Sequence, residues 1–171
     1  MPLRAKLAGR QLLPNGEWIL ILAVLAEVAI FSATAPGFFT TANLFEVLRF
    51  SVELGMLAVA MTPIMLTGGI DLSVGSTLGL AATIFGLMWQ THHLSIAASV
   101  LVVLLVGCLS GALNALLIAG LRLPALIVTL GTYSLYRGIA EGITHGAISY
   151  TGFPAPFLLL GQGYFWKIIP I

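Results

Sequence analysis

Charge and cysteine are both scarce in this sequence. Charged residues make up 8% of its 171 residues, hydrophobic residues make up 59%, and the mean hydropathy is +1.08. A soluble globular domain carries about 25% charged residues, so this chain cannot cover a water-exposed surface. Its net charge of +1 argues against a nucleic-acid partner, which requires a basic face. The composition therefore predicts an integral membrane protein that contacts lipid and no nucleic acid.

The sequence also lacks the patterns of a catalytic or metal-binding site. Cys108 is the single cysteine, so no intramolecular disulfide can form. His92 and His93 are adjacent and lack the spacing of a helical metal site, and no Ser-His-Asp order stands out. The stretch "GGIDLSVGST" at 68–77 lacks the lysine that a P-loop requires. We expect no enzyme activity, and no metal or cofactor bound by this chain.

Long apolar runs dominate what is present. A bilayer core about 30 Å thick needs about 20 helical residues, and five stretches reach or approach that length. We therefore expect an all-α, polytopic bundle that forms a single membrane domain over residues 1–171. The expected spans are 18–35, 44–66, 73–90, 95–119 and 124–142, and a sixth is expected to start at "YFWKIIPI".

The positions of the cations predict the orientation in the membrane. Cytoplasmic loops carry an excess of Lys and Arg. The N-terminal leader holds three cations and the loop 120–123 holds Arg122, whereas 36–43, 91–94 and 145–163 hold no Lys or Arg. We therefore expect a cytoplasmic N-terminus and a multi-pass protein of the plasma membrane.

Small residues recur every four positions on several predicted helices. Lipid gives helices no hydrophobic reason to associate, so residues that permit close approach promote their packing. We expect close helix contacts along these faces. The residues are Gly75 and Gly79; Gly107, Gly111, Ala115 and Ala119; and Gly138, Gly142 and Gly146.

The stretch "LTGGIDLSVGST" at 66–77 holds the only aspartate and separates two apolar runs. Gly68 and Gly69 favour a helix break over 67–73, after which Asp71 or Ser73 is placed to cap the next helix. A cap near the membrane surface is one interpretation. The other is a broken helix that lines a water-filled path, where backbone and hydroxyl groups meet a polar solute. The two interpretations are compatible.

Ionisable residues inside predicted spans need a partner or access to water, because lipid penalises an isolated charge. In "FEVLRFSVELG", Arg49 follows Glu46 by three residues and precedes Glu53 by four, so it can pair with either acid. Glu53 lies deeper in its span and is a candidate for a pathway. In "TYSLYRGIAEG", Arg137 and Glu141 are four residues apart, and we expect them to pair.

Neutral polar residues add hydrogen-bonding capacity near these charges, although a single Asn in a span is also explained by contacts between helices. The candidate lining of a substrate pathway therefore comprises Glu53, Gly68, Gly69, Asp71, Ser73, Ser76, Asn114, Thr129, Thr132, Arg137 and Glu141.

Two motifs in this order resemble a known family. "LTGGIDLSVGS", followed by "GALNALLIAGLRLPALIVTLGTYSLYRGIAEGIT", resembles the permease subunit of bacterial ATP-binding-cassette (ABC) sugar importers of the ribose, xylose, rhamnose and autoinducer-2 type. The resemblance covers most of residues 40–150. The matching positions are Gly69, Ile70, Asp71, Ser73, Val74, Gly75 and Ser76, then Pro124, Thr129, Leu130, Gly131, Thr132, Arg137 and Gly138.

The resemblance implies a set of partners. It implies a second permease copy or paralogue, a periplasmic sugar-binding protein that delivers the solute, and a separate cytoplasmic ATP-binding subunit that carries ATP and Mg²⁺. Such permeases are commonly near twice this length, so the chain resembles the N-terminal half of one. The resemblance places it in the bacterial inner membrane, where it would import a monosaccharide or autoinducer-2.

Two other functions remain open on the sequence alone. An ATP-independent channel or secondary transporter also uses broken helices. A non-transporting remnant would explain the length.

Overall fold

The computed structural model describes residues 17–165 and 169–170. The chain divides into two compact units, Met1–Phe50 and Ser51–Ile171. Helix α2 begins in the first unit and ends in the second. The helices are α1 (Glu17–Thr34), α2 (Thr41–Leu66), α3 (Val74–Gln90), α4 (Ile96–Ala115), the π-helical turn η1 (Leu116–Gly120), α5 (Ala125–Thr144) and α6 (Ala155–Gln162).

The described part of the first unit contains α1 and the first turns of α2. A tight turn joins the two helices, and Gly37 within it has a φ of +87° that favours glycine. The Asn43 side-chain amide donates to the Phe38 carbonyl at 2.8 Å. Phe38 also stacks on Phe31 with ring centroids 6.0 Å apart. These contacts fix the turn between the two helices locally.

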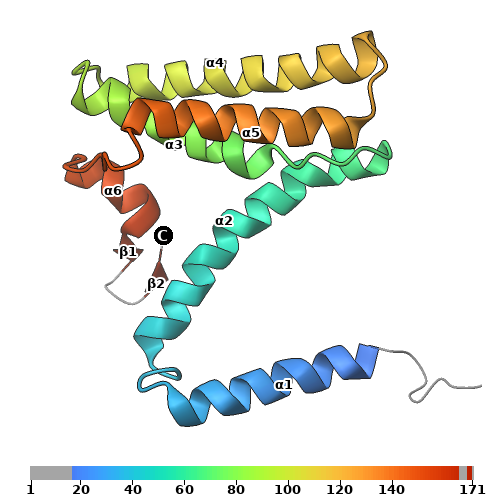
Figure 1. Ribbon diagram of the computed structural model, residues 1–171. Coiled ribbons are helices and arrows are strands. Elements are labelled where there is room, and N and C mark those ends of the chain that lie inside the picture. The colour runs from blue at the N-terminus through green and yellow to red at the C-terminus, as the bar shows by residue number, and fades with distance from the viewer. Residues whose placement is uncertain (1–16, 166–168, 171) are drawn as a thin grey trace, which may run out of the picture. The chain divides into compact units, whose positions relative to one another are not determined.

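Three helices form the body of the second unit. Figure 1 shows α3, α4 and α5 side by side, and α3 contacts both of the others more extensively than they contact each other. Helices α3 and α5 run in the same direction and α4 runs in the opposite one. The loop 91–95 joins α3 to α4, and 121–124 joins η1 to α5. Helix α3 therefore has α4 on one side and α5 on the other.

The interior of this bundle is more polar than its surface. Among the described residues, the buried hydrophobic side chains are Leu80, Val128 and Tyr136, whereas large apolar side chains are exposed along every long helix. The buried polar side chains are Ser73, Ser76, Ser99, Ser110, Asn114, Thr129 and Thr132. Helices in lipid associate through packing and hydrogen bonds rather than through the hydrophobic effect, which explains this arrangement.

The structure confirms the predicted all-α helical bundle, and the five long helices lie where the apolar runs predicted them. By length and composition, Ile96–Gly120 is the one helix in the described part of the chain that is long and apolar enough to cross a bilayer. Trp18–Thr34 and Val74–Gln90 are apolar but shorter. The assignment of the other helices as spans stays a prediction.

Of the stretch where a sixth span was expected to start, the structure describes 164–165 and 169–170, whereas 166–168 and 171 lie outside the described residues. Tyr164–Phe165 (β1) pairs antiparallel with Ile169–Pro170 (β2), with Tyr164 opposite Pro170. Proline lacks the backbone N–H that a helix interior requires. The additional helix is α6, which begins earlier, at Ala155.

The glycines of the small-residue faces do not make the expected close contacts with other described residues. A Cβ added to Gly75, Gly79, Gly107, Gly111, Gly138 or Gly142 would meet nothing within 4 Å, so these faces are open. The close approach occurs at Gly86 instead. The Tyr150 ring, which comes from the segment after α5, occupies the space that a side chain at Gly86 would need.

We predict that Gly86→Ala destabilises the protein by about 1–3 kcal/mol, because its methyl group would overlap the Tyr150 ring. Gly111→Ala is the control, since a Cβ there meets open space. Thermal unfolding in detergent measures both variants, and Tyr150→Ala should relieve the effect of Gly86→Ala. Equal stability of Gly86→Ala and Gly111→Ala would contradict the contact.

Candidate functional site

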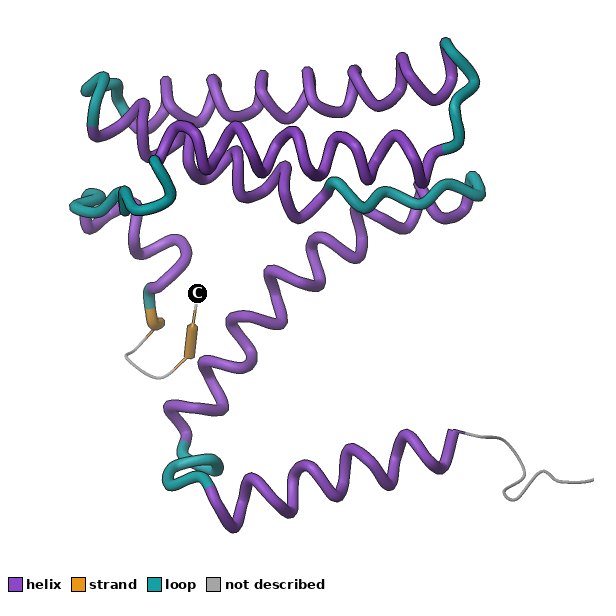
Figure 2. The backbone as a smooth tube through the Cα atoms, in the orientation of Figure 1, coloured by secondary structure: helices purple, strands orange, loops and turns teal. Residues whose placement is uncertain are grey.

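The helix break lies at the predicted residues, 67–73. Helix α2 ends at Leu66 and α3 begins at Val74, and Figure 2 shows the non-helical segment between them. Gly68 has a φ of +77°, a conformation that glycine adopts without strain. The Gly69 N–H donates to the Ile64 carbonyl at 3.1 Å, and a Cβ at Gly69 would lie 3.3 Å from Ile64. Both glycines therefore serve the turn that ends α2.

Asp71 organises the end of this segment but does not cap α3 as expected. Its Oδ1 accepts hydrogen bonds from the Ser73 N–H at 2.7 Å and from the Ser73 hydroxyl at 2.6 Å. Ser73 occupies the N-cap position, yet its side chain makes no hydrogen bond to the first turn of α3. The carboxylate instead closes a local turn two residues long, which Asp commonly does before a helix.

Two neighbouring helices hold the same segment. The Asn114 side-chain amide of α4 donates to the Ser73 hydroxyl at 2.9 Å. The Thr129 hydroxyl of α5 donates to the Ile70 carbonyl at 3.2 Å. Ser73 and Thr129 are each 1% exposed, so these hydrogen bonds are shielded from competing water. Four of the predicted residues are thus brought together as one network (the Asp71 network): Asp71, Ser73, Asn114 and Thr129.

Two further predicted residues are buried beside this network. The Ser76 hydroxyl donates to the Ser73 carbonyl at 2.8 Å. The Thr132 hydroxyl donates to the Val128 carbonyl of its own helix at 3.2 Å. Both hydroxyl protons are therefore used within the protein.

Sequence reasoning missed other polar contacts of the interior. The Tyr136 hydroxyl of α5 donates to the Ser110 carbonyl of α4 at 3.0 Å, and Tyr136 is 4% exposed. The sequence did contain a signal for this contact, because Tyr136 follows Thr129 by seven residues and Thr132 by four and so lies on the same helix face.

Sequence reasoning also missed Glu27, an exposed carboxylate within α1.

A cavity of about 460 Å³ lies beside α3 on the α4 side. Asp71, Ser73 and Asn114 line it together with apolar residues of both helices. The Asn114 side-chain oxygen is buried and receives no hydrogen bond from the described residues. This α3/α4 cavity therefore has a polar end at the helix break.

A second cavity, of about 480 Å³, lies between α3 and α5. Its lining includes Ser76, Tyr133, Arg137 and Glu141. The predicted ion pair is confirmed, because Arg137 Nε lies 2.8 Å from Glu141 Oε1. Arg137 Nη1 also donates to the Tyr133 hydroxyl at 3.2 Å. We call this cavity the α3/α5 groove.

The acids of α2 are not among the residues that line either cavity. Of its two possible partners, Arg49 pairs with Glu46, and the closest charged atoms are 2.5 Å apart. Glu53 is exposed and makes no ion pair or hydrogen bond with the described residues. The structure therefore does not bring Glu53 together with the other predicted pathway residues.

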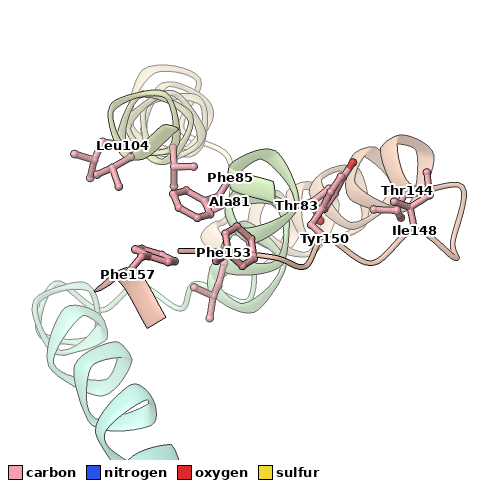
Figure 3. Close-up of a pocket in the computed structure, with 13 residues that line it drawn as sticks. Ala81, Thr83, Phe85, Leu104, Thr144, Ile148, Tyr150, Phe153 and Phe157 are labelled. Atoms are coloured by element: carbon pink, nitrogen blue, oxygen red, sulfur yellow. The ribbon is translucent and has the colours of Figure 1, made fainter. Parts of the chain in front are cut away.

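A third cavity, of about 540 Å³, is mostly apolar. Figure 3 shows Phe85, Phe153 and Phe157 grouped in it, and the Phe85 ring stacks on the other two at centroid distances of 5.5 and 5.0 Å. The Thr151 N–H donates to the Gln90 side-chain oxygen at 3.1 Å. These contacts attach the segment after α5 to the end of α3.

No three His, Cys, Asp or Glu side chains of residues 17–165 and 169–170 are grouped as a metal site requires.

Comparison with known proteins identifies relatives. Residues 43–157 match the family described as the branched-chain amino acid transport system / permease component. The autoinducer 2 import system permease protein LsrC of Enterobacter sp. (strain 638) is 41% identical over 129 residues, which cover 75% of this chain and 37% of that protein. The LsrC protein of Yersinia pestis (strain Pestoides F) is 36% identical over 157 residues, which cover 92% of this chain and 44% of that protein. The chain spans about two fifths of the length of these relatives. No solved structure matches it.

We predict that Asp71→Ala impairs folding or transport more than Glu46→Ala. Asp71 accepts two hydrogen bonds at the helix break, and hydrogen bonds to a charged group contribute about 1.5–3 kcal/mol each. Glu46 makes one ion pair near the start of α2. Protein yield and solute uptake in cells that carry the full-length importer compare the two variants. Near-normal values for both would exclude a special role for 66–77.

We also predict that Arg137→Ala and Glu141→Ala act on the same interaction. The double variant should lose little more uptake than the more damaging single variant, because either substitution already removes the pair. A double-mutant cycle of uptake rates measures the coupling. Losses that simply add would show that the two side chains act independently.

Proposed function

Because the chain belongs to the permease family described above, we propose that it forms the first part of the membrane subunit of a binding-protein-dependent ABC importer. The cargo is a monosaccharide or autoinducer-2. A periplasmic binding protein delivers it, a second permease copy or paralogue completes the pathway, and a separate cytoplasmic subunit hydrolyses ATP. The N-terminus is cytoplasmic, and the protein lies in the bacterial inner membrane.

One observation of the structure carries this proposal. A polar, non-helical segment interrupts an apolar chain, and hydrogen bonds from two other helices fix it. Non-helical backbone at membrane depth is tolerated only where protein buries it or where it lines a water-filled cavity. Broken helices of this kind form solute sites in transporters. The chemistry beside the break, hydroxyls, amides and backbone groups, suits a neutral polar solute.

The names of the relatives support the choice of cargo. Both LsrC proteins are called autoinducer 2 import permeases, whereas the family description mentions branched-chain amino acids. In the α3/α5 groove, Arg137 and Glu141 form an ion pair, so this groove offers no separate positive and negative sites. A zwitterionic amino acid would need such separate sites. We therefore favour a neutral polyhydroxylated cargo.

Reconstitution of the complete importer tests this function. The full-length permease that contains this sequence would be placed in proteoliposomes with its ATPase, and the loaded binding protein would be added outside. We expect the binding protein to stimulate ATP hydrolysis, and ATP to be required for uptake of a labelled pentose, deoxyhexose or autoinducer-2. Leucine is the control solute.

Two outcomes would contradict the proposal. Uptake at the same rate without the ATPase would favour an ATP-independent channel or secondary transporter. Failure of every solute to enter, with a correctly folded complex, would favour a non-transporting remnant.

A further inference from the structure

The α3/α5 groove is a polar surface on an apolar protein. The side chains of Arg137 and Glu141 are 62% and 58% exposed, although both belong to the stretch 124–142 that is expected to span the membrane. A charged side chain that faces the bilayer centre costs about 2.5–3.5 kcal/mol on insertion scales. This face of the bundle therefore requires water or a polar molecule against it.

The floor of the groove is open. Gly75 and Gly79 of α3 line it, and a Cβ added to either would meet nothing within 4 Å. With a volume of about 480 Å³, the groove falls in the range of about 300–1,000 Å³ that small-molecule sites occupy. Larger side chains at these positions would fill the groove. The two glycines thus provide space for a ligand rather than for a neighbouring helix of the described chain.

The groove offers hydrogen-bond donors and an acceptor side by side. Arg137 donates from Nε to Glu141 Oε1 and from Nη1 to the Tyr133 hydroxyl. Within the described residues, Arg137 Nη2, the Tyr133 hydroxyl proton and Glu141 Oε2 have no hydrogen-bond partner. A sugar hydroxyl both donates and accepts, so a diol matches this set. The paired charges sum to zero, so the groove selects for no net charge.

We propose that the α3/α5 groove is a binding site for a neutral polyhydroxylated solute, whose hydroxyls contact Arg137, Glu141 and Tyr133. This inference rests on the proposed import function and assigns the solute to one side of α3. The α3/α4 cavity on the other side is the alternative location. Its lining is mostly apolar and holds the Asp71 carboxylate and the unpartnered Asn114 oxygen, but none of the described residues that line it is a cation.

Cysteine labelling distinguishes the two sides of α3. Gly79→Cys places a thiol in the α3/α5 groove, and Gly107→Cys places one in the α3/α4 cavity. Both positions are open, so both substitutions should fold. The native Cys108 lines the α3/α4 cavity and is replaced by Ser in both variants. The complete importer, in proteoliposomes, would be treated with a charged methanethiosulfonate, with and without saturating autoinducer-2 or transported sugar.

We expect the reagent to modify Gly79→Cys, and the solute to slow that reaction several-fold while leaving Gly107→Cys unchanged. Protection at Gly107→Cys alone would move the site to the α3/α4 cavity. No reaction at Gly79→Cys would mean that protein covers the groove. Protection of Gly79→Cys by leucine but not by sugar would overturn the polyol class. Each of these results contradicts the groove site.

A kinetic variant separates this inference from the proposed function. Glu141→Gln keeps the shape of the side chain but removes its charge, so we expect a several-fold higher KM for uptake with kcat largely retained. Glu46→Gln is the matched control, because Glu46 is not among the residues that line the groove. If wild-type uptake requires ATP and Glu141→Gln leaves KM unchanged, the importer stands and the groove site fails. If the wild-type complex does not import, the proposed function itself fails.

Discussion

The structure depends on the hydrogen bonds that fix the segment 67–73 between two helices. A helix break leaves backbone groups without partners, and in a membrane each unsatisfied group costs several kcal/mol. Thr129 satisfies the Ile70 carbonyl, Asp71 satisfies the Ser73 N–H, and Asn114 holds the Ser73 side chain. The Asp71 network therefore makes an interrupted helix possible, and it sets where α3 begins relative to α4 and α5.

The position of α3 determines where the polar surfaces of the second unit lie. It packs between α4 and α5, so one cavity forms on each side of it. The α3/α4 cavity ends at the Asp71 network, which is mostly buried and bonded within the protein. The α3/α5 groove carries the exposed pair of Arg137 and Glu141. Apart from Glu53, which lines neither cavity, the predicted pathway residues thus form a group that holds the fold and a group that can meet a solute.

The positions of the helices and of the break could be predicted from the sequence. The length of an apolar run and the conformational freedom of glycine are local properties, which do not depend on the rest of the fold. Contacts between helices could not be predicted, because spacing shows which residues share a face but not which helix that face meets. The Gly107 and Gly111 face was expected to pack, yet no described residue lies within 4 Å of a Cβ added there, and a close contact is made at Gly86. Arg49 has one acid three residues before it and another four residues after it, so the sequence alone did not show which one it pairs with. The structure shows that it pairs with Glu46. The motifs that carry the family resemblance include Asp71 and Thr129. They did not indicate that these two residues belong to one hydrogen-bond network.

Side chains of α4 and α5 hold the break in place. Hydrogen–deuterium exchange of the full-length permease in lipid nanodiscs tests it, with Thr129→Val as the variant, because valine keeps the shape and removes the donor to Ile70. We expect faster exchange of the amides in 67–73, with exchange in α4 and α5 unchanged. Exchange in 67–73 that equals that of the wild type, or protection as strong as in an unbroken helix, would contradict this expectation.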